Sequence, residues 1–229
     1  MASQPPRSLN HFSTFCFTDA YWSKDKAFRQ DLHADWLQAV RQTAVSVHHY
    51  QTYGLERASD FLMWCAVPAD EKTAALSFFS TFAESTGPFR AFIQLRDTLW
   101  GLTRRSQYSR ARSAGEIDPF ERDRTHPYLI VYPFTKTAEW YLEDQETRQD
   151  MMNEHMRIGK QYRRIGQLLL YSFGLQDQEF VVVYETDDLS RFSELVQALR
   201  TTQGRRYTKG DTPIHTGIYQ PDGTALPVW

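Results

Sequence analysis

The chain has 229 residues and a formal net charge of −2, with a sequence pI near 6.4. That length can bury a proper core as one large domain or as two halves of ordinary size. The near-neutral charge argues against a general nucleic-acid surface, which needs a pronounced basic excess. The N-terminus has no apolar signal core and no run approaches the length of a membrane span, so we expect a soluble, cytoplasmic protein.

The first half of the chain predicts elements in the order strand, helix, strand, strand, helix, strand. Alternating or continuous apolar runs predict the strands, and apolar residues at spacings of three and four predict the helices. Asp70 is expected to cap the second helix. Cys16 and Cys65, the only cysteines, each fall in a strand-like apolar run, so we expect both to be reduced core residues. The predicted elements are residues 11–19, 25–45, 47–53, 61–68, 70–84 and 89–103.

A polar, charged and turn-rich stretch follows at residues 104–126, which is typical of a long surface loop or linker. Four arginines cluster there around Tyr108. Their spacing fits a solvated loop better than a surface that reads a nucleic-acid groove. They are Arg104, Arg105, Arg110 and Arg112.

The second half opens with a buried strand at residues 128–132, which we expect Pro133 to end, because its ring nitrogen cannot donate to a ladder. Tyr132 and Lys136 therefore stand at a strand exit, where polar groups often face a site. Residues 149–165 predict a helix with His155 in the middle of its apolar face. The rest of that face is Met151, Met152, Ile158, Gly159, Tyr162 and Ile165.

A lone histidine on an apolar helix face is either a core residue bonded to a carbonyl or a ligand. The phenol of Tyr132, the amine of Lys136 and the carboxamide of Gln167 lie in the same segment as His155. These neighbours favour the second interpretation. Four other histidines are weaker candidates. His48 and His49 are adjacent on a predicted strand and face opposite sides. His126 and His215 have no cysteine or carboxylate at the spacing of metal ligands.

The two halves look like copies of one unit. Tyr53-Gly54-Leu55 matches Phe173-Gly174-Leu175, and in both copies an apolar run and an amphipathic helix follow, the second helix at residues 189–201. This predicts an α+β fold of duplicated ferredoxin-like (β-α-β-β-α-β) units that form a β-barrel flanked by helices. The predicted divisions are residues 10–103, a linker at 104–126 and residues 127–220. The first copy has no counterparts of Tyr132 and Lys136, so we expect the pocket in the second copy.

Several spaced motifs in the second half together resemble the chlorite dismutase family of haem proteins. Members of that family are double ferredoxin-like barrels, usually homopentamers, with haem iron held by one proximal histidine. The resemblance implies that His155 is this metal ligand, which would explain an imidazole on an apolar helix face. It covers about the last hundred residues. The motifs are Tyr132-Pro133-Phe134-Thr135-Lys136, Glu139-Trp140-Tyr141, Met151-Met152-Asn153-Glu154-His155, Ser172-Phe173-Gly174-Leu175 and Glu179-Phe180.

The residue expected above the iron indicates the branch of the family. Chlorite-decomposing members have an arginine on the strand after the ligand helix, where this chain has Gln167. A glutamine there resembles the coproheme decarboxylase branch, whose substrate is the iron porphyrin coproheme III and whose product is haem b. That branch uses hydrogen peroxide and a tyrosine matching Tyr132, which relays a radical to a propionate. The alternatives are a chlorite dismutase and a non-catalytic haem-binding or haem-sensing protein.

The remaining site predictions concern charge around the porphyrin. Lys136 is expected to pair with a propionate or to tune the iron's proximal side, the alternative being a solvated lysine after a strand. The turn Gly204-Arg205-Arg206-Tyr207 is basic enough for Arg206 to meet a propionate, the alternative being a solvated loop. Where relatives commonly have a glutamate bonded to the proximal imidazole, this chain has Gln203 and Gly204, which would push less electron density through His155.

Overall fold

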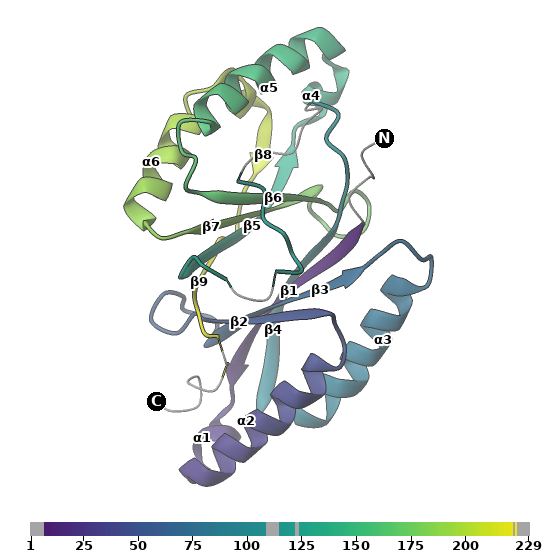
Figure 1. Cartoon of the computed structure of the whole chain (residues 1–229), viewed down its shortest axis with the longest axis vertical. Coiled ribbons are helices and arrows are strands. Elements are labelled where there is room, and N and C mark those ends of the chain that lie inside the picture. Colours follow the sequence, from purple (N-terminus) through teal and green to yellow (C-terminus); the bar gives the residue numbers. More distant parts are fainter. Residues whose placement is uncertain (1–6, 109–114, 122–123, 222, 224–229) are drawn as a thin grey trace. The chain divides into compact units, whose positions relative to one another are not determined.

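A computed structural model describes residues 7–108, 115–121, 124–221 and 223 of the chain. The chain divides into two compact units, the first from residues 1–103, 118–125 and 216–229, the second from residues 104–117 and 126–215 (Figure 1). The stretch that we expected to be a linker therefore contributes to both units. No helix among the described residues is long and apolar enough to cross a membrane.

The first unit has the order strand, helix, strand, strand, helix, strand, followed by a strand from the end of the chain. Its antiparallel sheet runs β4-β1-β3-β2-β9, and the buried side chains between one face of this sheet and its helices form the unit's core. The elements are β1 (Ser8–Phe17), α1 (Asp19–Trp22), α2 (Lys26–Arg41), β2 (Ser46–Gln51), β3 (Phe61–Pro68), α3 (Ala74–Thr86), η1 (Gly87–Phe89), β4 (Ile93–Thr103) and β9 (His215–Tyr219).

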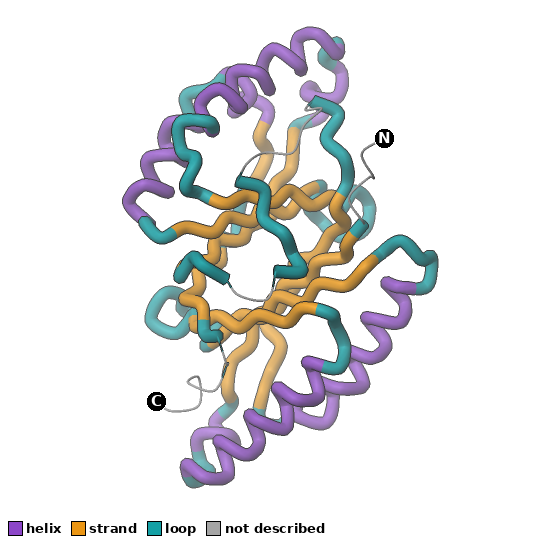
Figure 2. The backbone as a smooth tube through the Cα atoms, in the orientation of Figure 1, coloured by secondary structure: helices purple, strands orange, loops and turns teal. Residues whose placement is uncertain are grey.

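The second unit repeats the order. Its sheet runs β6-β7-β5-β8, so each unit places its first four strands as fourth, first, third, second. Figure 2 draws the strands in orange and the helices in purple. This repetition confirms the predicted α+β fold of duplicated ferredoxin-like units. The elements are β5 (Tyr128–Lys136), α4 (Ala138–Leu142), α5 (Gln145–Gly159), β6 (Gly166–Tyr171), β7 (Phe180–Thr186), α6 (Leu189–Leu199), η2 (Gln203–Tyr207) and β8 (Thr208–Gly210).

Three predicted boundaries in the second unit were wrong. Pro133 does not end β5, which continues to Lys136 with Pro133 buried opposite Val181, because a proline fits a strand where its nitrogen need not donate. Helix α5 starts four residues earlier than expected, since Asp144 caps it by accepting a hydrogen bond from the Thr147 N–H at 2.8 Å. It ends at Gly159, so the last two residues of its predicted apolar face lie beyond the helix.

The first unit also corrects two expectations. Asp70 does not cap α3: the helix begins at Ala74 without a side-chain cap, and Asp70 accepts a hydrogen bond from the Arg7 N–H at 3.1 Å. Cys65 is buried, and burial raises the pKa of its thiol, as expected of a core residue. Cys16 is only partly buried, because its side chain points toward Gln94 at the side of the sheet.

The first unit buries neutral histidines. His11, His33, His48 and His49 are all buried, and loss of hydration lowers the pKa of His11 and His33 to about 4 and that of His48 and His49 to about 3. His48 accepts a hydrogen bond from Arg124 Nε at 3.2 Å. Among the described residues, no group of three or more metal-ligating side chains forms. Their rings pack against aromatic side chains of the unit, His11 against Phe82 and His33 against Trp36.

We expect these histidines to make the protein acid-sensitive. Their pKa is lowered in the folded state, so the unfolded state binds more protons below pH 6.5, and stability falls as the pH drops from about 6.5 to about 4. Each histidine that must be charged on unfolding contributes a loss of about 1.4 kcal/mol per pH unit in that window. Urea unfolding of the apoprotein at pH 7 and pH 5 measures the loss.

A matched variant is His11→Leu, because His11 packs against Phe78, Phe79 and Phe82 and its Nδ1 has no hydrogen-bond partner. Removal of this one titrating group should flatten the dependence of stability on pH. Equal unfolding midpoints at the two pH values in the wild type would contradict the prediction.

Candidate functional site

Strand register places Tyr132 and Gln167 on one face of the second unit's sheet. Tyr132 is opposite Val182, which is opposite Leu169, and two residues before Leu169 lies Gln167, opposite Tyr184. Paired residues share a face and alternate residues return to it. We call this the α6 face, and it consists of Ile130, Tyr132, Phe134, Gln167, Leu169, Tyr171, Phe180, Val182 and Tyr184.

Helix α6 covers only part of this face. Leu195 of α6 is buried in a cluster with Ile130 and Tyr184, and Tyr132 packs against the same cluster. On β6, by contrast, Gln167 is exposed and Leu169 is 42% exposed. An exposed apolar side chain beside a carboxamide is a surface suited to a flat apolar ligand with a polar centre.

Tyr132 is half-buried on this face. Burial, followed by the neighbouring phenol of Tyr184, raises the pKa of Tyr132 well above that of an ordinary tyrosine. The side chain therefore keeps its O–H throughout the physiological range. A shielded phenol with its hydrogen in place can give up a hydrogen atom.

His155 lies on α5, one turn after the buried Met151 and on the same side of the helix. Burial and the nearby charge of Lys136 lower the pKa of His155, so the imidazole is neutral at pH 7. No hydrogen bond contributes to this shift. A neutral, half-buried imidazole is the form that binds iron.

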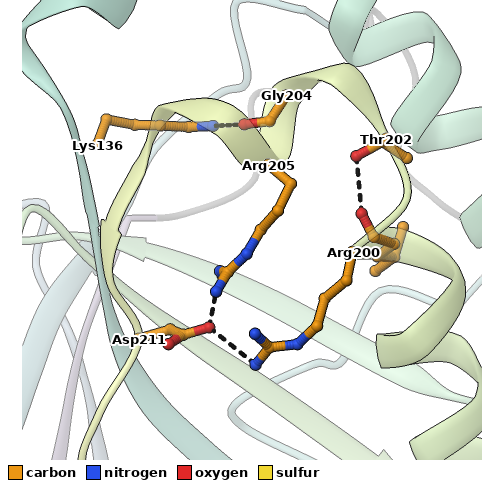
Figure 3. A network of polar contacts seen from close by, with 7 residues as sticks. Lys136, Arg200, Thr202, Gly204, Arg205 and Asp211 are labelled. Atoms are coloured by element: carbon orange, nitrogen blue, oxygen red, sulfur yellow. Dashed lines mark hydrogen bonds and ion pairs between the residues drawn. The ribbon is translucent and has the colours of Figure 1, made fainter.

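Lys136 is tied to the segment after α6. Its Nζ donates to the Gly204 carbonyl at 3.1 Å (Figure 3). The same nitrogen lies 4.1 Å from the centroid of the Trp140 ring. Burial and the charge of Arg205 lower its pKa to about 8. The predicted alternative of a solvated lysine therefore does not hold. The charge of Lys136 contributes to the lowered pKa of His155.

The segment that carries Gln203 and Gly204 packs beside α5. The Gln203 N–H donates to Glu154 Oε2 at 2.9 Å, which fixes η2 to the residue next to His155. The Gly204 carbonyl is taken by Lys136. The backbone groups of Gln203 and Gly204 therefore tie this segment to α5 and β5. They do so at the place where we expected relatives to have a glutamate.

Arg206 and Arg205 differ in their surroundings. Arg206 is exposed on η2. The next guanidinium inward is that of Arg205, which bonds Asp211 Oδ2 at 2.8 Å, while Arg200 bonds the same oxygen at 3.2 Å (Figure 3). Asp211 and Arg200 both act electrostatically on Tyr132. Sequence reasoning missed this cluster, since consecutive arginines on a short turn do not reveal which one points inward.

Residues 115–117, in the stretch predicted to be a linker, pair with β6 at Gln167. The Gln167 N–H donates to the Gly115 carbonyl at 2.8 Å, and the Ile117 N–H donates to the Gln167 carbonyl at 3.0 Å. A Cβ on Gly166 would lie 3.0 Å from Ile117 Cγ1, so a glycine allows this close approach. The backbone of Gln167 is thereby held on both sides. Two of the linker arginines, Arg110 and Arg112, lie outside the described residues.

A separate hollow of about 980 Å³ borders the connections from α5 to β6 and from β7 to α6. It is lined by charged side chains, among them Arg163 and the ion-paired Arg164 and Asp187. None of the predicted site residues lines it. His126 is half-buried, and His215 is buried at the start of β9.

These residues fit a haem-type iron porphyrin. The neutral imidazole of His155 is a suitable iron ligand, and the exposed Leu169 offers an apolar surface to the ring. Lys136 and Arg205 supply positive charge for its carboxylates. The donor set and the charge distribution are therefore those that such a group requires.

Comparison with known proteins decides the family. The profile of the family described as chlorite dismutase matches residues 26–220, which is most of the chain and includes the first half. The chain belongs to the chlorite dismutase family. The predicted family is thus confirmed, and the match is longer than the hundred residues on which the prediction stood.

Two relatives in the family have named activities. A coproheme decarboxylase of Mycolicibacterium smegmatis is 30% identical over 210 residues, which cover 90% of this chain and 87% of the relative. A chlorite dismutase of Ideonella dechloratans is 24% identical over 220 residues, 92% of this chain and 75% of the relative. Both are enzymes by name.

Solved structures show the same fold. Chlorite dismutase from Candidatus Nitrospira defluvii in complex with imidazole has a TM-score of 0.81 at 22% identity, over 97% of this chain and 95% of that one. A double mutant of the same enzyme has a TM-score of 0.80 at 25% identity, over 96% and 94%. The duplicated fold is therefore shared along nearly the whole chain.

Proposed function

We propose that this protein is a peroxide-dependent coproheme decarboxylase, which converts coproheme III to haem b in haem biosynthesis. The observation that carries the proposal is the composition of the α6 face, where a shielded phenol and a carboxamide lie together. Tyr132 can give a hydrogen atom, and Gln167 offers an uncharged hydrogen bond. On residues 130–134, 167–171 and 180–184, this face carries no cation that could hold an oxyanion.

In the proposed reaction, coproheme is the substrate and peroxide oxidises its iron. Tyr132 loses an electron and a proton, and its phenoxyl radical takes a hydrogen atom from the propionate carbon nearest the ring. The resulting carbon radical would give up a further electron to the peroxide-oxidised iron porphyrin, and loss of CO₂ from that propionate would leave a vinyl group. Each propionate and proton consume one peroxide and give one vinyl group, one CO₂ and two waters, so the electrons balance.

The other residues would bind and orient the porphyrin. His155 is proposed as its protein ligand to iron. Lys136, whose charge lowers the pKa of that imidazole, would tune the ligand, and Gln167 would donate a hydrogen bond from the sheet side. Arg206 remains a proposed partner for a propionate, and Arg205 joins it because its guanidinium points inward.

The proposal is tested by adding peroxide in small portions to the protein loaded with iron coproporphyrin III. Chromatography of the extracted porphyrins should show a three-propionate intermediate and then haem b. A protein that binds coproheme but leaves all its propionates intact would be a haem carrier or sensor. The family relationship also supports a cytoplasmic homopentamer, which sedimentation would test for oligomer size.

Chlorite decomposition is a second candidate, favoured by the relative from Ideonella dechloratans. We expect poor oxygen evolution from chlorite by the wild type, because Gln167 has no charge with which to hold an oxyanion. Gln167→Arg should raise the rate, measured with an oxygen electrode on haem-loaded protein, whereas Gln167→Leu should not. Rapid oxygen evolution by the wild type would overturn the preference for decarboxylation.

A further inference from the structure

Tyr184 is a second phenol on the α6 face, next to Tyr132. It lies opposite Ile130 on β5 and opposite Gln167 on β6, so it is the diagonal neighbour of Tyr132. The two rings are nearly parallel, with centroids 6.1 Å apart and an interplanar angle of 26°. The strand register fixes this arrangement, because both side chains project from paired strands.

Both phenols are shielded from water. Tyr184 is 6% exposed and packs against Phe192 of α6 at a centroid distance of 5.2 Å. Burial raises the pKa of both phenols, so both keep their O–H at neutral pH. The two hydroxyl groups also interact with each other. A neighbour of the same chemistry, protonated and stacked, is thus available to Tyr132.

We propose that Tyr132 and Tyr184 form a relay that shares one oxidising equivalent, an inference that rests on the proposed function for its oxidant. The O–H bond of Tyr184 breaks as the O–H bond of Tyr132 re-forms, and one proton and one electron cross together. No net charge moves, and a phenol is exchanged for a phenol, so neither direction is strongly uphill. Tyr184 acts through Tyr132 and is a positioning residue.

The relay gives the oxidising equivalent a site shielded from water when no propionate is within reach of Tyr132. On Tyr184 the radical is covered by α6, and it returns to Tyr132 by the reverse exchange. Without Tyr184 the equivalent stays on the less shielded ring and is lost more often to side reactions. Fewer vinyl groups should then form for each peroxide consumed.

The relay is tested by electron paramagnetic resonance on coproheme-loaded protein, frozen soon after mixing with peroxide. We expect two tyrosyl components in the wild type and one in Tyr184→Phe, a substitution that keeps the ring and removes only the hydroxyl. Tyr21→Phe is the matched control, because Tyr21 is a buried tyrosine of the first unit, away from the α6 face, and its ring stacks on Phe17. It should retain both components.

The yield of vinyl groups per peroxide should fall severalfold in Tyr184→Phe and stay unchanged in Tyr21→Phe. A Tyr184→Phe spectrum and yield equal to those of the wild type would overturn the relay while leaving the decarboxylase intact. A wild type that forms no vinyl product fails the proposed function instead, and the relay then stands only if both tyrosyl components appear. Absence of any tyrosyl signal in the wild type overturns the relay.

Discussion

Replacement of Tyr132 by phenylalanine is expected to lower coproheme decarboxylation by orders of magnitude while coproheme binding changes little. The ring still packs against the cluster that contains Ile130, Tyr184 and Leu195. The lost hydroxyl is worth about 0.5–1.5 kcal/mol, a typical net hydrogen bond. That loss weakens binding by about tenfold at most. Phenylalanine has no oxidisable O–H, so the first decarboxylation fails although peroxide still oxidises or bleaches the iron.

Separate loss of turnover and retention of binding is the mark of a group that acts in the transition state. Absorption titration measures the binding, and chromatography of the porphyrins measures the turnover. Tyr162→Phe is a suitable control, because this tyrosine packs on the same cluster as Tyr132. If Tyr132→Phe converted coproheme at nearly the wild-type rate, Tyr132 would be only a packed strand residue and the carrier hypothesis would lead.

Replacement of His155 by alanine is expected to abolish the iron–imidazole band in the resonance Raman spectrum of the loaded protein. Affinity should fall by more than the roughly 10- to 100-fold that loss of an outer-shell partner costs a metal site. The fold should persist, because His155 is only half-buried and its neighbour Met151 supplies the buried contact of α5. Thermal unfolding of the apoprotein measures that persistence.

Two controls sharpen the His155 experiment. His126→Ala removes another half-buried histidine of the same unit and should leave the band unchanged. Free imidazole added to His155→Ala should restore an axial nitrogen ligand and part of the turnover. An unchanged iron–histidine band in His155→Ala would end the assignment.

The sequence predicted the duplicated plan because that plan depends on local pattern. The two Gly-containing turns and the apolar runs after them repeat at matching places, and the structure gives both units the same strand order. His155 was legible because one imidazole interrupts an apolar helix face. Tyr132 and Lys136 were legible because they flank a proline in an otherwise apolar strand.

Other features depend on tertiary contacts and could not be predicted from the sequence. In β7 nearly every residue is apolar, so alternation does not show that Tyr184 shares a face with Tyr132. The pairing of Gly115 and Ile117 with Gln167 joins a polar linker to a strand some fifty positions away, and no local propensity encodes it. The end of α5 at Gly159 is set by a turn, although the apolar spacing continues past it.

The most direct test of the account counts vinyl groups against peroxide in the wild-type coproheme complex. Peroxide is added at known ratios to the protein, and the porphyrins and the released CO₂ are quantified after each addition. We predict one vinyl group and one CO₂ for each peroxide, with the three-propionate porphyrin formed first and haem b after the second equivalent. Peroxide consumed with no vinyl group formed, and with the porphyrin intact or bleached, would contradict the proposed function.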